Sequence, residues 1–217
     1  MKLITKKMKL ALVMASAALI VLPGMGTAGT SETGNTVGQL LYSSNQTPNG
    51  EGLLMAVEVE ALMAASFANQ LIKAPANLEI IKERAKDLRD AIVPTSGNLG
   101  NGRGYGLIQA AEKALTAVDH LSNARQVGSD TGIFAKKTAT EMRNIVNWSK
   151  EVLVQSDRVL AARTTTEAMA YAQEIKVLTS YILFGISKVE NNAMASKNQG
   201  GIAKVVSLKL PMYGAGK

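Results

Sequence analysis

Cysteine is absent from the 217-residue chain, and histidine occurs only once, as His120. The absence of cysteine excludes disulfides, thiolate-bound zinc, iron–sulfur clusters, a cysteine nucleophile and covalently attached haem. The single histidine forms no recognisable Ser-His-Asp set, and no cluster of histidine and carboxylate residues indicates a catalytic zinc. Burial of apolar side chains must therefore hold the chain together, and its length is sufficient for one domain.

Aromatic residues are also scarce, at 4% of the chain, and they are scattered along it. Nucleic-acid binding typically uses a basic patch with aromatic residues interleaved. The formal net charge is +7, from 24 Lys and Arg against 17 Asp and Glu, but residues 1–28 contribute four lysines and no acid. Without that segment the balance is 20 against 17, or +3, and we expect no nucleic-acid partner.

Long apolar runs are lacking too, with one exception near the start. Residues 10–22 form an apolar stretch of 13 residues, with four lysines before it and Pro23 and the small residues of GMGTAG after it. This order is typical of a secretory signal peptide, here residues 1–28 with cleavage after Ala28. Because the run is shorter than the roughly 20 residues of a membrane span, we expect a periplasmic or extracellular protein with no stable membrane span after cleavage.

Beyond residue 50, apolar residues recur at the 3.6-residue spacing of amphipathic helices. The pattern predicts helical segments over about 51–75, 78–92, within 104–126, 130–162 and 165–189. Asn77 is the predicted N-cap of the second segment, and Thr164 with Glu167 forms a predicted capping box for the fifth. The sequence therefore predicts an all-α antiparallel bundle of four to five helices, in one domain over residues 51–190.

The two ends of the remaining chain are rich in Gly, Ser and Asn and lack an apolar stripe. We expect residues 29–50 to be a flexible leader, with Leu-Leu-Tyr at 40–42 as a docking point, and residues 191–217 to be a flexible tail. Within the tail, VVSLKL at 205–210 has a short β-like pattern. It could add as a strand to the sheet edge of another chain.

His120 is the first candidate for a ligand, on the helix predicted within 104–126. It lies about 160° around that helix from the centre of the apolar face, whereas a metal or b-type haem in a bundle core needs an inward-facing ligand. Asp119 is adjacent, but it points about 100° away around the helix. His120 and Asp119 are thus candidates for a metal site only with ligands from elsewhere, and we expect a solvated histidine and no cofactor.

Two further patterns also have simpler interpretations. Glycines at 97, 100, 102, 104 and 106 precede a helix start, where backbone N–H groups can bind an anion. A phosphate-binding loop follows a β-strand, whereas this one follows a helix, so an ordinary loop between helices is predicted. Six methionines follow residue 28 without a Met-x-x-Met cluster, which favours core packing over Cu(I) binding.

The segment IKERAKDLRDAI at 81–92 concentrates charged side chains. All-α enzymes can use Arg, Lys and Glu as their only chemical groups, which makes this segment the basis of an enzyme hypothesis. The same pattern is typical of a solvent-exposed helix face with ion pairs one turn apart. The charged residues are Lys82, Glu83, Arg84, Lys86, Asp87, Arg89 and Asp90.

Two stretches resemble a loosely defined group of exported bacterial all-α proteins, some of them rich in histidine. The second stretch is TTTEAMAYAQEIKVLT at 164–179, and the similarity spans about residues 52–185. The resemblance implies an exported helical bundle. This chain lacks the further histidines and the acidic Asp-x-Asn-x-Asp-Gly loop of some members, so no metal or calcium site is carried over. The first stretch comprises Gly104, Tyr105, Gly106, Ala110, Ala111, Glu112 and His120.

These features together predict an exported, non-enzymatic helical bundle that acts by binding a protein partner or by self-assembly. One alternative is a periplasmic metal- or haem-binding bundle that assists electron transfer or metal handling. A second alternative is a small all-α enzyme that uses Arg, Lys and Glu chemistry.

Overall fold

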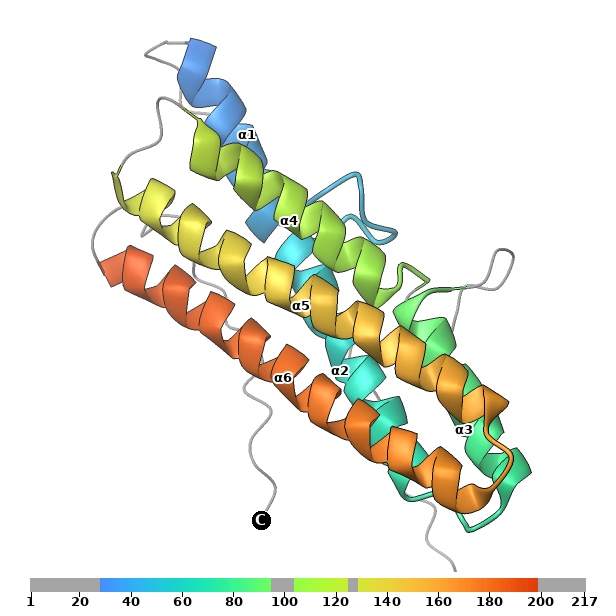
Figure 1. The fold of residues 1–217 in the computed structure, drawn as a ribbon. Helices are drawn as coiled ribbons and strands as arrows, with labels where there is room; N and C mark the ends of the chain where they lie inside the picture. Colours follow the sequence, from blue (N-terminus) through green and yellow to red (C-terminus); the bar gives the residue numbers. More distant parts are fainter. Residues whose placement is uncertain (1–27, 95–103, 125–128, 199–217) are drawn as a thin grey trace, which may run out of the picture.

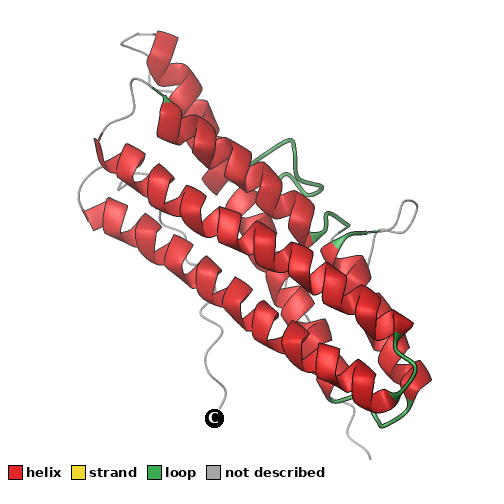
Figure 2. Cartoon of the chain, in the orientation of Figure 1, coloured by secondary structure: helices red, strands yellow, loops and turns green. Residues whose placement is uncertain are grey.

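The computed structural model describes residues 28–94, 104–124 and 129–198. The described residues form helices joined by loops, with no strand among them (Figure 2), which confirms the predicted all-α class. The helices are α1 (Ala28–Leu41), α2 (Leu53–Ile72), α3 (Leu78–Ile92), α4 (Leu107–Asn123), α5 (Ser129–Ala161) and α6 (Thr165–Asn198).

Local signals in the sequence set where α3 and α6 begin. The Asn77 side chain accepts hydrogen bonds from the N–H groups of Glu79 and Ile80, at 2.9 and 3.3 Å. The Thr164 hydroxyl accepts one from the N–H of Glu167 at 3.2 Å, and the Glu167 carboxylate accepts one from the N–H of Arg163 at 2.9 Å. Both predicted caps are therefore confirmed, although Glu167 reaches the N–H before the cap residue rather than that of the cap itself.

Helices α5 and α6 form a long antiparallel hairpin, and α2, α3 and α4 pack along it (Figure 1). Helix α4 packs on α5, α2 packs on α6, and α3 contacts both helices of the hairpin. Among the described helices, α1 contacts only α2 and α4. Alanines supply much of the buried side of α2, which lets its neighbours approach closely.

Figure 1 shows α1 followed by α2, and α3 followed by α4, as two interrupted legs beside the hairpin. Each interruption ends at a glycine N-cap, Gly52 before α2 and Gly106 before α4. A Cβ on Gly52 would lie 2.5 Å from the carbonyl carbon of Leu41, and a Cβ on Gly106 would meet the ring of Pro94. Glycine is therefore required at both positions, because the start of each second helix touches the end of the helix before it.

The prediction of four to five helices is wrong by one, because the described residues contain six. The additional helix is α1, within the segment that was predicted to be a flexible leader. Its few apolar side chains are enough to pack it, because Leu40 and Leu41 are buried and Val37 packs against the core. Tertiary burial here outweighs the weak helix propensity of Gly, Ser and Thr.

The predicted end of the last helix, near Val189, is also too early, because α6 continues to Asn198. Ala193 is buried and extends the stripe of Ile186 and Val189 by one more turn. Ala193 is a single small residue after two asparagines, so the apolar spacing in this part of the sequence is too weak to predict a helix. The signal segment, most of the glycine run and the VVSLKL stretch lie outside the described residues.

Candidate binding surfaces

His120 is exposed and lines a polar groove between α1 and α4. The groove encloses about 590 Å³, and amide and hydroxyl side chains dominate its lining. Its other lining residues are Asn35, Thr36, Gln39, Gln46, Gln109, Glu112, Lys113, Thr116 and Ala117.

The structure does not bring Asp119 to His120 as a joint site. Asp119 forms an ion pair with Arg143 of α5, so its carboxylate serves the contact between α4 and α5. Within the described ranges, no group of three or more His, Cys, Asp and Glu side chains is arranged to hold a metal ion.

The charged residues of α3 take part in ion pairs on the surface. Arg84 pairs with Asp87 one turn along α3 at 3.4 Å, and Arg89 pairs with Asp157 of α5 at 2.9 Å. These side chains are partly exposed, so each pair contributes on the order of 0–1 kcal/mol to stability. The methionines predicted to pack in the core include Met142, which is buried, and Met169, which packs against the core.

Acidic side chains between the helices were missed by the sequence reasoning. Glu60 of α2 is almost fully buried, and its Oε1 accepts a hydrogen bond from the N–H of Tyr105 at 3.4 Å. Burial raises the pKa of Glu58, and the charge of Glu190 raises it further. Burial also raises the pKa of Glu190. Burial, together with repulsion from Glu190 of α6, thus favours the protonated form of Glu58 on α2.

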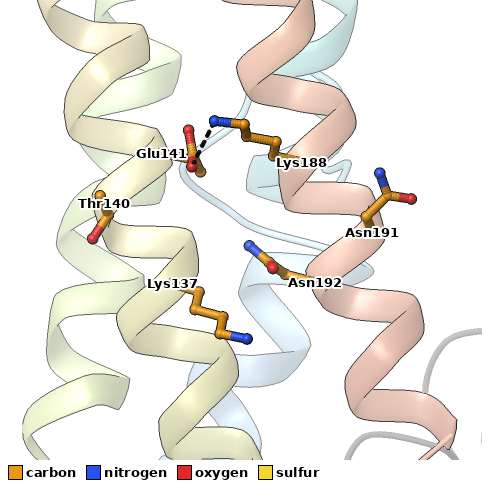
Figure 3. A pocket seen from close by; sticks show the side chains of 6 residues that line it. All are labelled: Lys137, Thr140, Glu141, Lys188, Asn191 and Asn192. Atoms are coloured by element: carbon orange, nitrogen blue, oxygen red, sulfur yellow. Dashed lines mark ion pairs between the residues drawn. The ribbon is translucent and has the colours of Figure 1, made fainter.

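A second polar pocket lies between α5 and α6 and is shown in Figure 3. Lys137, Thr140 and Glu141 of α5 line one side of it, and α6 supplies Lys188 and two asparagines. Lys188 forms an ion pair with Glu141 at 3.4 Å. The pocket therefore has a basic character at this end of the hairpin, because two lysines flank one carboxylate.

The outer face of α6 exposes large apolar side chains. Val177, Tyr181 and Phe184 are 50, 49 and 58% exposed. At 100° per residue they lie within about 40° of Val177 around the helix, roughly opposite the buried stripe that runs through Ile175 and Ile182. We call Val177, Tyr181 and Phe184 the outer stripe of α6.

Helix α5 supports this stripe from the side. The Trp148 ring lies 5.7 Å from the Tyr181 ring between centroids. A Cβ on Gly185 would lie 3.0 Å from Ile145 and 3.2 Å from Trp148, so α5 and α6 are in close contact here. Lys188 Nζ lies 4.7 Å from the Phe184 ring centroid, in a cation–π contact. The aromatic side chains are thus held by neighbours although one side of each faces solvent.

An acidic groove continues the outer stripe toward the start of α6. It encloses about 390 Å³ and is lined by Glu151 and Gln155 of α5 together with Gln173, Glu174, Val177 and Leu178 of α6. Along the hairpin, acidic side chains at Glu151 and Glu174 are followed by the aromatic centre and then by the lysines of Figure 3. The sequence did carry a signal for this surface, because the last helix has apolar residues on two faces.

Comparison of the chain with protein-family models, with curated proteins and with solved structures finds no match. The resemblance to exported bacterial helical proteins therefore stays a prediction. None of the helices in the described part of the chain combines the length and apolarity that a membrane span requires.

Proposed function

We propose that this protein is an exported, non-enzymatic helical bundle that acts by binding another protein through the outer stripe of α6. The observation that carries the proposal is the outer stripe itself. Seven large apolar residues are exposed in the described residues, and three of them lie together on this one face. Tyr and Phe are enriched at protein interfaces, where large rigid rings bury apolar area at a small cost in side-chain entropy.

The surroundings of the stripe also support a protein partner. Charged side chains of both signs border the aromatic centre, which is the arrangement of an apolar interface core with a polar rim. The grooves on this face are shallow seams between two helices rather than enclosed cavities. A flat, apolar and charged surface of this kind is suited to another protein surface more than to a small molecule.

The proposed export is based on the first 28 residues. Four lysines, a 13-residue apolar run and a small-residue segment form the order of a signal peptide. Cleavage after Ala28 would leave α2 to α6 whole and would remove only the first residue of α1. Mass spectrometry of the exported fraction should find an N-terminus near Gly29, and mature protein that retains residues 1–9 would disprove export with cleavage.

Photo-cross-linking in the cells that make the protein tests the binding function. A photoreactive amino acid at Val177 should give a covalent adduct with a protein. The matched control is the same amino acid at Val154, which is 43% exposed on α5 and does not belong to the outer stripe. An adduct from position 177 in clear excess over position 154 is the expected result. Equal yields, or no adduct at position 177, would overturn the proposed function.

A further inference from the structure

We infer that the partner of the outer stripe is a second copy of this chain, packed antiparallel along α6 with Tyr181 at the two-fold axis. This inference rests on the proposed function, because it names the protein that the stripe binds. A two-fold interface uses the same patch on both subunits, so the patch must be complementary to itself. The outer face of α6 meets this requirement in both its apolar residues and its charges.

The spacing of the apolar residues fits the antiparallel pairing. In an antiparallel pair centred on residue 181, position 177 faces position 185 and position 184 faces position 178 of the other copy. Val177 of one copy then lies within one residue, or about 1.5 Å along the axis, of Phe184 of the other. Gly185 itself is buried against α5, so the apolar neighbour that Val177 meets on the other copy is the exposed Phe184 ring.

The charges are complementary in the same register. Glu174 precedes Tyr181 by seven residues and Lys188 follows it by seven, so the antiparallel pairing places Glu174 of each copy opposite Lys188 of the other. Both residues lie within about 60° of Val177 around α6, on the outer face. Lys188 already pairs with Glu141 of its own chain. An ammonium group has three donors, so it can bind the second carboxylate as well.

A parallel pairing would lose this complementarity. Glu174 would then face Glu174, and Lys188 would face Lys188. Like charges opposite one another are unfavourable, so the charge pattern selects the antiparallel orientation.

Charge exchange tests the pairing between the ends of the stripe. Sedimentation over a concentration series should show reversible dimers of the wild-type protein. Glu174→Lys and Lys188→Glu should each weaken the dimer by at least about tenfold, because each creates two like-charge contacts across the axis. An equimolar mixture of the two variants should form a heterodimer of near wild-type affinity, since both contacts across the axis then join a lysine to a glutamate. Glu83→Lys, an exposed charge change on α3, is the matched control and should leave dimerisation unchanged.

Cysteine substitution tests the axis independently of the charges, since the natural chain has no cysteine to interfere. Under mild oxidation Tyr181→Cys should form a disulfide-linked dimer, because the two Cα atoms lie near the axis and a disulfide spans about 4.4–6.8 Å. Val177→Cys alone should not, because the two positions are about 12 Å apart along the axis. A mixture of Val177→Cys and Phe184→Cys should cross-link, whereas Val154→Cys should not cross-link at all.

The outcomes separate this inference from the proposed function. Cross-linking by both Val177→Cys alone and Phe184→Cys alone would show a parallel pair and overturn the inference. Monomeric wild-type protein at all concentrations, with no disulfide from Tyr181→Cys, would overturn it as well. If the photo-cross-link from position 177 then joins a different protein, the proposed function stands without the dimer. If position 177 gives no adduct, both fail.

Discussion

Three glycines near the α1–α2 junction provide a test of whether α1 is a docked part of the bundle. Gly38 lies within α1, and a Cβ there would meet nothing within 4 Å. Gly50 also has open space, but its φ of +68° is unfavourable for an L side chain. Gly52 has an ordinary φ of −63°, yet a Cβ would lie 2.5 to 2.8 Å from the backbone of Leu41 and Tyr42. The three positions thus separate helix propensity, backbone strain and steric contact.

The expected free energies of unfolding follow from these differences. Gly38→Ala should stabilise the protein by about 0.5–1 kcal/mol, because alanine is the better helix former. Gly50→Ala should destabilise it by about 1–2 kcal/mol, the cost of a left-handed conformation with a Cβ. Gly52→Ala should destabilise it by about 1–3 kcal/mol, as overpacking against backbone that cannot rotate away.

Urea unfolding followed by far-UV circular dichroism measures all three values, with the slope of the transition as a check on two-state behaviour. The native spectra of the variants should be the same as that of the wild-type protein. If Gly52→Ala were as stable as Gly38→Ala, the contact between Leu41 and Gly52 would not exist in solution. The docking of α1 onto the start of α2 would then be refuted.

Three further changes have defined outcomes. Glu58→Gln should stabilise the protein at pH 7, because burial and the nearby charge of Glu190 raise the pKa of Glu58. A carboxyl with a raised pKa contributes stability below about pH 4.5 that is lost as the pH rises through its pKa in the folded protein. Urea unfolding at pH 4 and pH 7 should show a smaller difference in stability for the variant, and an unchanged difference would contradict the raised pKa of Glu58. Asn77→Ala should cost about 1 kcal/mol by loss of the α3 cap, measured by thermal unfolding, with Asn77→Ser close to wild type; equal stability of the two variants would exclude the cap. His120→Ala should change the free energy of unfolding by less than about 0.5 kcal/mol and leave elemental analysis unchanged, whereas a lost metal would show that His120 is a ligand.

Much of the fold could be predicted because local signals and tertiary burial agree over most of the chain. The caps at Asn77 and Thr164 are formed as their sequences predict, and the apolar stripes of α2 and α5 are the buried ones. Helix α1 could not be predicted in this way, since its sequence favours a loop and only packing on α2 and α4 makes it helical. The spacing of apolar residues also cannot show that the start of α2 contacts the end of α1, or that the start of α4 contacts the residues after α3.

The outer stripe of α6 illustrates a different limit of sequence reasoning. A search for the core stripe assigns one apolar face to each helix, and the residues of the other face then remain without an assigned role. Tyr181 and Phe184 are apolar like the core residues of α6, and they are exposed because α5 and α2 pack on the other sides of the helix. The positions of α5 and α2 cannot be derived from the sequence of α6. The ion pair of Asp119 with Arg143, 24 positions later in the chain, likewise depends on how α4 and α5 are aligned.

The touching ends of the interrupted legs make the two junctions suitable sites for chain insertion. At the α1–α2 junction, the chain leaves at Leu41 and returns at Gly52 to almost the same point, so a longer connection would have to close over the same short distance. The same holds where Gly106 meets Pro94. Doubling the length of such a loop costs only about 0.6 kcal/mol of closure entropy. An epitope or a small domain could therefore be carried at either junction while the hairpin of α5 and α6 keeps its outer face unchanged.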